Sequence, residues 1–367
     1  MKIIFLCGSL QPGRDGVGDY SRKLAAGLMA SGNEAVIISL NDKFLSSAWV
    51  KEAQHDGSKE ITAYRYSAGM QWNEKIRQVA ALISSFKPDW LSLQYVSYSF
   101  DKKGLPFYLP GVLSGLTANY KWHIMFHETW IGISPAAPFL HKIYGYFQRR
   151  IAASLIKLLN PVSVTTTNVL YELVLSEKDI DVTRLPLFSN ISRHQPNKEY
   201  ISSIEKEYSV EMEGNSFYKL GVFGTLYPES NLSEVIPKFL ENKRHDKQVA
   251  IIIFGKNNRP DELLKLKKRL KNKVSFVELG ELTEENVSSV MNILDEAVLC
   301  TPYEFIGKSG AYAALRLHNV PVVTLSSSPT NKYENEINAY NKYLSQRPAE
   351  KWGVQHISHK FLSILNQ

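Results

Sequence analysis

Three short segments of the sequence carry residue types that could bind a ligand or move a proton. The first, residues 8–21, is rich in glycine and follows an apolar run. Glycine lets the backbone approach a ligand closely, and the N-terminus of a following helix favours anionic groups. The G-x-x-G-x-G spacing, with no acidic residue closing the run Ile38–Leu40, differs from the dinucleotide fingerprint and disfavours a dehydrogenase. A plain turn from strand to helix fits the glycines equally well.

The second segment is Phe126-His127-Glu128-Thr129-Trp130, which directly follows the apolar run Trp122–Phe126. Residues that leave the carboxyl end of a strand stand at the rim where α/β sheets bind ligands. His127 or Glu128 could therefore orient a hydroxyl group or exchange a proton. A histidine that only caps the strand fits the same pattern.

The third segment, residues 301–315, joins a strand ending at Cys300 to a predicted helix. Gly307, Ser309 and Gly310 would expose backbone N–H groups at the helix start, and Lys308 adds a full positive charge. This combination predicts a loop that binds a diphosphate. The G-x-x-x-x-G-K-[ST] spacing of the P-loop is absent, which disfavours a kinase or ATPase.

The elements that must position these segments are short apolar runs rich in Val, Ile and Phe, with helical patterns between them. Such runs are typical of parallel strands buried on both faces, and their alternation with helices predicts a doubly wound α/β sheet. The pattern occurs twice along the chain. The predicted strands are Ile3–Cys7, Ala35–Leu40, Trp90–Gln94, Trp122–Phe126, Val162–Thr166, Lys219–Phe223, Val249–Phe254, Val274–Val277, Glu296–Cys300 and Val320–Thr324.

The 367 residues are enough for two domains. The regular pattern is interrupted between Pro186 and Asn215, where we place the linker. We predict one Rossmann-like domain over residues 1–190, a second over 191–345, and a C-terminal helix within 346–367 that packs back toward the N-terminal domain.

Composition narrows the class of protein. The content of 44% hydrophobic and 22% charged residues is typical of a folded globular protein. Cys7 and Cys300 lie far apart in apolar runs, which indicates buried thiols in a reducing compartment, and the apolar start is too short for a signal peptide or membrane span. We therefore expect a cytoplasmic protein.

The net charge of +7 comes from one region, because Lys238 to Lys273 holds twelve Lys and Arg against four Asp and Glu. Few aromatic residues alternate with these cations. A solvated helix face explains them better than a nucleic-acid surface, so no nucleic-acid partner is expected.

These features resemble the GT-B glycosyltransferases, and within them the retaining family-four-like enzymes that use nucleotide-sugar donors. The resemblance covers nearly the whole chain. It rests on Gly16-Val17-Gly18-Asp19-Tyr20-Ser21, Pro88–Tyr95, Phe126-His127, Gly221-Val222-Phe223-Gly224-Thr225-Leu226, Glu278-Leu279-Gly280-Glu281-Leu282 and the segment from Pro302-Tyr303-Glu304 to Val323.

The resemblance implies two Rossmann-like domains facing each other across a cleft, with His127, Glu304 and Lys308 as catalytic residues. Relatives carry an arginine at the position of Thr225 and a lysine at that of Ser230, so Lys308, with Lys256 as second choice, is expected to supply the missing charge. Tyr312 stands where a second glutamate would contact the ribose. The donor-binding residues implied are Gly16, Val17, Gly18, Thr225, Lys256, Leu279, Gly280, Ser309, Gly310, Ala311 and Tyr312.

The implied activity is hexosyl transfer from a nucleotide sugar, a substrate rather than a cofactor, to a glycan or lipid-linked acceptor in cell-envelope polysaccharide synthesis. The resemblance also implies retention of configuration and catalysis without a metal. Two alternatives stay open: a sugar-nucleotide epimerase, and a catalytically silent protein that binds a sugar nucleotide.

The segment Pro138–Asn160 contains four cations, several large aromatic residues and no carboxylate. Such a segment resembles a basic amphipathic helix on an anionic membrane. An ordinary helix whose aromatic residues face the core fits as well. The membrane interpretation places the enzyme at the inner face of the plasma membrane.

Overall fold

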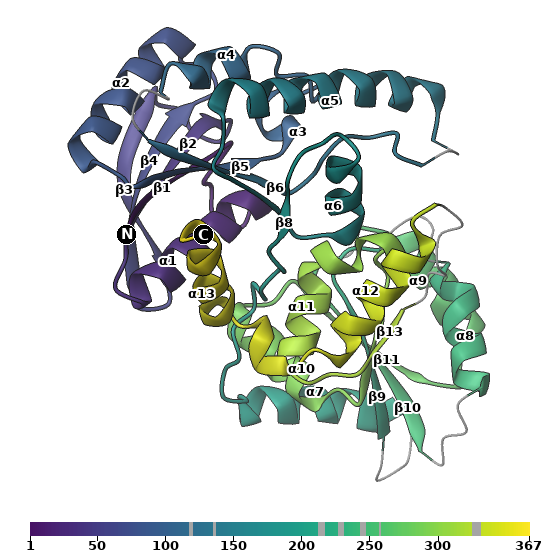
Figure 1. Ribbon diagram of the computed structural model, residues 1–367. Coiled ribbons are helices and arrows are strands. Elements are labelled where there is room, and N and C mark those ends of the chain that lie inside the picture. Colours follow the sequence, from purple (N-terminus) through teal and green to yellow (C-terminus); the bar gives the residue numbers. More distant parts are fainter. Residues whose placement is uncertain are drawn as a thin grey trace. The chain divides into compact units, whose positions relative to one another are not determined.

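The computed structural model describes residues 1–116, 120–134, 137–211, 217–226, 231–242, 247–256, 258–324 and 332–367. The chain divides into two units. The N-terminal unit comprises Met1–Pro186 and Val354–Gln367, and the C-terminal unit comprises Leu187–Gly353. Each unit is a sheet flanked by helices (Figure 1).

The N-terminal unit contains an eight-stranded sheet in the order β3-β4-β2-β1-β5-β6-β7-β8. All neighbouring strands are parallel except β3 and β4, which form an antiparallel pair at one edge. The strands are β1 (Lys2–Cys7), β2 (Glu34–Asp42), β3 (Trp49–Asp56), β4 (Lys59–Ser67), β5 (Trp90–Tyr95), β6 (Lys121–Phe126), β7 (Ser163–Thr166) and β8 (Thr183–Arg184).

Alternate residues of a strand point to opposite sides of the sheet, so side chains stand on both faces. Helices cover both of these faces. Residues such as Leu91, Leu93 and Ile124 join a core with α2, α4 and α5. The other face packs against α13, where Phe361 contacts the ring of His123. The helices of the unit are α1 (Gly16–Ala30), α2 (Trp72–Phe86), α3 (Ser97–Phe100), α4 (Leu109–Ser114), α5 (Phe139–Leu159), α6 (Val169–Ser176) and α13 (Val354–Leu365).

Helix α13 follows the whole C-terminal unit in sequence and returns to lie against α1 (Figure 1). The two helices approach closely at Gly27, where an added Cβ would lie 2.3 Å from Oγ of Ser358. A larger residue at this position would therefore force the Ser358 side chain to move.

The C-terminal unit contains a five-stranded parallel sheet in the order β11-β10-β9-β12-β13. Helices α7, α10 and α11 pack on one face, and α8 and α9 on the other. The strands are β9 (Phe217–Phe223), β10 (Gln248–Phe254), β11 (Ser275–Gly280), β12 (Glu296–Leu299) and β13 (Val322–Thr324). The helices are α7 (Lys198–Glu211), α8 (Leu232–Asn242), α9 (Pro260–Arg269), α10 (Glu284–Ile293), η2 (Tyr303–Lys308), α11 (Gly310–Leu317), α12 (Glu334–Gln346) and η3 (Ala349–Trp352).

Both sheets contain a topological switch point, where consecutive connections leave in opposite directions. In the N-terminal unit β1 lies between β2 and β5, and in the C-terminal unit β9 lies between β10 and β12. Open α/β sheets bind ligands outside the carboxyl ends of the strands at such points. The segments after β1, β5, β9 and β12 are therefore where a ligand is expected.

The predicted fold class of two doubly wound α/β domains is confirmed, and each of the ten predicted strands matches a strand of the structure. The hairpin β3–β4 was not predicted, because it lies at a sheet edge and half of its residues are polar. The region between Pro186 and Asn215 is not irregular throughout, since α7 lies within it and buries Ile204 against the C-terminal core. None of the helices in the described ranges combines the length and apolar character of a membrane span.

Candidate functional site

Three adjacent strands of the C-terminal unit each end in a glycine with left-handed backbone. Gly224, Gly255 and Gly280 follow or close β9, β10 and β11 with φ angles of 86°, 89° and 64°. The N–H of Gly255 donates a 2.7 Å hydrogen bond to the carbonyl oxygen of Gly280, and that of Gly224 donates to Phe254 at 3.4 Å. Only glycine adopts this conformation without strain. At these three positions the carboxyl edge of the sheet carries no side chain.

Helix α11 begins beside this edge. A Cβ added to Gly224 would lie 3.3 Å from Cβ of Ala311, so the loop after β9 abuts the first turn of the helix. Ser309 is the N-cap, and its Oγ accepts a 3.2 Å hydrogen bond from the N–H of Tyr312 and lies 2.9 Å from Oγ1 of Thr301. The N-terminus of a helix carries partial positive charge and favours an anion. The helix start thus favours phosphate, and the glycine edge beside it leaves room for one.

The predicted charged residues lie on the turn that precedes α11. Glu304 and Lys308 are half-buried in η2, and the Lys308 ammonium lies 5.2 Å from the centroid of the Phe305 ring. Thr225 is exposed in the loop after β9, and Lys256 is exposed immediately after Gly255. Leu279 is half-buried at the end of β11. Ser230 lies outside the described residues.

Tyr312 differs from the other predicted donor-binding residues. Its side chain is buried within the unit, and its ring packs edge-on against Trp352 with 5.4 Å between centroids. Burial raises the pKa of its hydroxyl group. We assign this side chain to packing and do not include it in the donor site proposed below.

In the N-terminal unit, Gly16, Val17 and Gly18 form the first turn of α1 and not the loop that the sequence predicted. The helix begins early because Asp15 is its N-cap, accepting hydrogen bonds from the N–H groups of Val17 at 3.0 Å and Gly18 at 2.9 Å. Burial raises the pKa of Asp15. A Cβ at Gly18 would lie 2.4 Å from the carbonyl oxygen of Ser9, whereas a Cβ at Gly16 would have no neighbour within 4 Å.

A buried ion pair holds the preceding loop in place. The Asp42 carboxylate accepts hydrogen bonds from Nε of Arg65 at 2.8 Å, from Oγ of Ser9 at 3.1 Å and from the N–H of Leu10 at 3.1 Å. Burial alone would raise the pKa of Asp42, but these hydrogen bonds, with one from Phe44, hold it below its ordinary value. Sequence analysis missed this pair, because its partners lie on separate strands.

His127 is the end of a buried chain of polar side chains that crosses three strands. Its Nε2 lies 2.9 Å from Oε1 of Gln94, and Nε2 of Gln94 donates to Oγ of Ser92 at 2.8 Å. Ser92 Oγ lies 2.8 Å from Nδ1 of His123, whose Nε2 lies 2.8 Å from Oγ1 of Thr165. We call these five residues the polar relay.

Hydrogen-bond direction along the relay follows from its far end. The Thr165 hydroxyl donates to the sulfur of Met125, so its oxygen accepts from Nε2–H of His123. Nδ1 of His123 then accepts from the hydroxyl of Ser92, which in turn accepts from Gln94. Oε1 of Gln94 accepts from Nε2–H of His127. In the neutral imidazole of His127, Nε2 therefore carries the hydrogen and Nδ1 the lone pair.

The relay lies next to the start of α1. The ring of Tyr20 meets that of His127 edge-on, with 4.8 Å between centroids. The structure therefore brings the glycine-rich segment and His127 to one edge of the N-terminal sheet. Ser92, His123 and Thr165 were missed from sequence, although polar residues inside apolar strands were a signal that could have revealed them.

Among the residues that the structure describes, no three His, Cys, Asp or Glu side chains are grouped so that they could hold a metal ion.

No protein-family model and no curated protein sequence matches the chain, whereas its fold matches solved structures. HepE from Anabaena, in complex with UDP and glucose, matches with a TM-score of 0.60 at 14% identity, over 100% of this chain and 99% of that one. A glycosyltransferase from Rickettsia africae gives 0.59 at 13% identity, over 99% and 97%. A putative UDP-N-acetylglucosamine 2-epimerase from Listeria monocytogenes gives 0.53 at 11% identity, over 99% and 95%.

These matches define the fold as GT-B, with two Rossmann-like domains, an architecture found both in glycosyltransferases and in sugar-nucleotide epimerases. At these identities the likeness establishes the fold alone. The family-four-like subtype predicted from the sequence stays a prediction.

The two glycines of α1 provide a matched pair of variants. We expect Gly18→Ala to lower the free energy of unfolding by about 1–3 kcal/mol, because its Cβ would overlap the Ser9 carbonyl. Gly16→Ala should change stability by less than about 0.5 kcal/mol, since its Cβ meets open space. Urea unfolding of both variants measures the difference, and equal losses would contradict the close contact.

His123 makes stability depend on pH. Burial, with a smaller effect of the His127 charge, lowers its pKa to about 3, against about 6.5 for histidine in an unfolded chain. Between these values the unfolded state binds a proton that the folded state does not. The contribution is therefore complete above about pH 6.5 and is lost as the pH falls, by at most about 1.4 kcal/mol per pH unit.

The measurement is urea unfolding of wild type and His123→Gln between about pH 7 and about pH 5. Glutamine keeps a donor and an acceptor but does not titrate. A shallower pH slope in the variant is expected. An identical slope would show that His123 is protonated in the folded state.

Proposed function

We propose that the protein is a glycosyltransferase that moves a sugar from a nucleotide-sugar donor to a glycan or lipid-linked acceptor. The observation that carries the proposal is the bare glycine edge beside the N-terminus of α11, at the switch point of the C-terminal sheet. The N-terminus of a helix favours phosphate, and glycines let a ligand approach the backbone closely. The GT-B fold that this chain shares with HepE, solved with UDP and glucose, supports the proposal.

The roles of the donor-site residues follow from where charge develops during the reaction. Breaking the sugar–phosphate bond builds negative charge on the diphosphate and positive character on the sugar, so fixed donors and cations near the phosphates accelerate the step. We assign this task to the start of α11, with Ser309, Gly310 and Ala311, and to Lys308, with Lys256 as second choice. Glu304 is assigned to the donor-sugar hydroxyls.

The remaining assignments follow from position in the fold. Leu279 and Gly280 close β11 and are assigned to the nucleobase, and Thr225 to the loop beside the phosphates. In the N-terminal unit, the first turn of α1 is assigned to the diphosphate or the acceptor. His127 is assigned to the donor sugar, on the family resemblance.

Retention of configuration, catalysis without metal and a place in cell-envelope polysaccharide synthesis complete the proposal and rest on the family resemblance. A cytoplasmic enzyme that works at the inner face of the plasma membrane fits a lipid-linked acceptor.

An epimerase is the second candidate, because a putative UDP-N-acetylglucosamine 2-epimerase has the same fold. An epimerase would convert the sugar of the donor without any acceptor. A silent binding protein would be stabilised by a donor but would release no nucleotide.

The decisive experiment mixes the protein with UDP-, ADP- and GDP-sugars and follows thermal stability, sugar configuration and nucleotide release. We expect one donor to stabilise the fold, by about 2.7 kcal/mol at 100 times its Kd. With membrane or polysaccharide extracts as acceptor source, that donor should release its nucleotide in proportion to the acceptor. Epimerised donor without acceptor would establish the second candidate, and binding without turnover the silent protein.

Lys308 offers a direct test of the charge assignment. We expect Lys308→Ala to lower kcat by about 10²–10³-fold with a smaller effect on donor affinity, because the cation acts on charge that develops in the transition state. Lys271→Ala, at an exposed lysine of the same unit, is the matched control and should keep the wild-type rate. A near-wild-type rate for Lys308→Ala would reduce this residue to a solvated lysine.

A further inference from the structure

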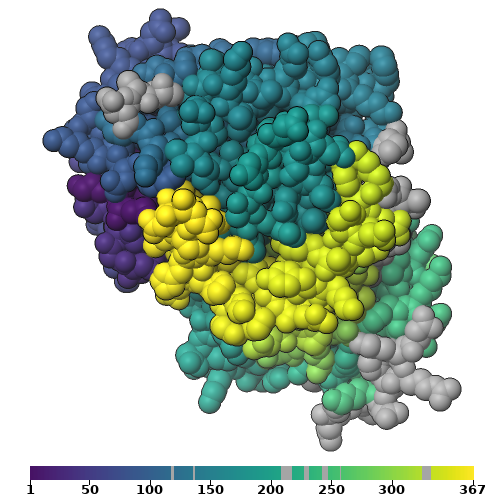
Figure 2. Space-filling view, in the orientation of Figure 1, coloured from purple at the N-terminus to yellow at the C-terminus, as the bar shows by residue number. Residues whose placement is uncertain are grey.

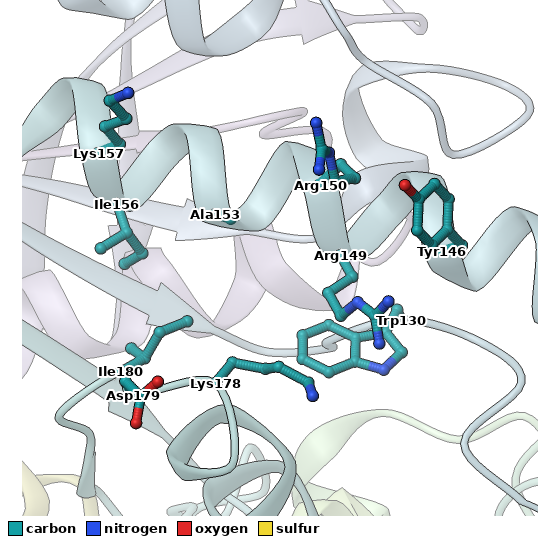
Figure 3. Close-up of a pocket in the computed structure, with 10 residues that line it drawn as sticks. All are labelled: Trp130, Tyr146, Arg149, Arg150, Ala153, Ile156, Lys157, Lys178, Asp179 and Ile180. Carbon is teal, nitrogen blue, oxygen red and sulfur yellow. The ribbon is translucent and has the colours of Figure 1, made fainter.

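A pocket of about 470 Å³ lies in the N-terminal unit, between α5 and the turn that follows α6 (Figure 3). Its volume is within the range of about 300–1,000 Å³ that is typical of small-molecule sites. Trp130, Ala153, Ile156 and Ile180 supply apolar walls. The polar groups of the predicted donor site do not line it.

Two cations converge in this pocket. Arg149 from α5 and Lys178 from the turn after α6 point toward the Trp130 ring from opposite sides (Figure 3). In the described part of the chain, no carboxylate lies within ion-pair distance of either cation, although Asp179 also lines the pocket. The Arg149 guanidinium lies 5.5 Å from the centroid of Tyr146, so an aromatic face is its partner. The pocket therefore has a net positive charge that favours an anionic occupant.

Close packing fixes the shape of the pocket before any ligand binds. Gly145 of α5 lies against the loop that carries Trp130, since an added Cβ would be 2.0 Å from the carbonyl oxygen of Ile131. Oε1 of the buried Gln148 accepts a 2.9 Å hydrogen bond from the N–H of Ile131. The glycine inside the helix, which costs helix stability, is thus explained by this contact.

The turns of α5 that precede the pocket expose large apolar side chains. Phe139 is 76% exposed and Leu140 is 65% exposed. Phe147, also exposed, meets Phe107 of the preceding segment with 5.8 Å between ring centroids. The helix lies at the surface of its unit (Figure 2). An exposed apolar patch of this kind marks an interaction surface.

The occupant must explain both the cations and the apolar patch beside them. A free phosphate or a nucleic acid would satisfy the cations but would leave Phe139 and Leu140 in water. A bilayer lipid has an anionic phosphate next to hydrocarbon, which matches this order of groups along α5. We propose that the pocket binds the phosphate headgroup of an anionic membrane lipid while the first two turns of α5 enter the bilayer interface. This binding does not depend on sugar transfer.

The test is co-sedimentation with vesicles of phosphatidylcholine, alone or mixed with phosphatidylglycerol. One variant combines Arg149→Gln with Lys178→Gln. The matched control combines Arg150→Gln with Lys157→Gln, which removes the same charge from the two other lining cations, whose charged ends point away from Trp130 (Figure 3). Both double variants should bind the anionic vesicles up to about thirtyfold more weakly. Each cation removed costs about fivefold in affinity, because diffuse electrostatic attraction to the membrane is lost. The pocket pair should lose about tenfold more, because charge-assisted hydrogen bonds to the phosphate are lost as well.

Equal losses in the two pairs would overturn the pocket assignment, as would equal binding to both kinds of vesicle or binding to neither. Tight binding of glycerol 1-phosphate without vesicle binding would show a site for a soluble phosphate instead. Phe139→Ser with Leu140→Ser, at two exposed positions that leave the core intact, should weaken vesicle binding and leave glycerol 1-phosphate binding unchanged. Donor-sugar stabilisation should be unaffected in every variant, so the outcome is separate from that of the transferase proposal.

Discussion

Parallel strand pairing decides where loops from distant parts of the sequence meet in each unit. Because nearly all strands of the N-terminal sheet and all strands of the C-terminal sheet run in one direction, their connections leave from a common edge. Loops that are distant in sequence, such as those of Gly224 and Ala311, meet there. The predicted site residues of each unit therefore gather where the strands end.

The sequence predicts the elements that are buried as continuous apolar runs. It does not predict features that depend on a single contact between residues distant in sequence. Buried strands such as β1 and β10 are continuous apolar runs, whereas β3 is an edge strand of mostly polar residues and resembles a loop. The two glycines in the first turn of α1 predict a loop. The structure has a helix there because the N-cap Asp15 outweighs them. In the candidate site, Lys308 and Ser309 could be proposed from local chemistry. The burial of Tyr312 against Trp352 could not, because the partner lies on another element.

The polar relay is stabilised by hydrogen bonds between buried groups and not by apolar contacts. Four of its members lie in the core of the N-terminal unit, where an unpaired polar group would cost about 1–3 kcal/mol. The hydrogen bonds from His127 to Thr165 pair these groups in one direction. Such a network is more sensitive than an apolar core to the loss of any one member, because each loss leaves a buried partner unpaired. The relay ends at the sheet edge that also holds the first turn of α1. The orientation of the His127 ring therefore depends on an intact sheet.

The return of α13 to the N-terminal unit affects the order in which the protein is made. Phe361 of this helix covers His123 and contacts Phe5, yet α13 leaves the ribosome only after all of Leu187–Gly353 has been synthesised. At about 5–20 residues per second, that interval lasts on the order of ten to thirty seconds. During it the first 186 residues have one face of their sheet without its final cover. The nascent N-terminal unit therefore completes its core only after translation of the unit that interrupts it.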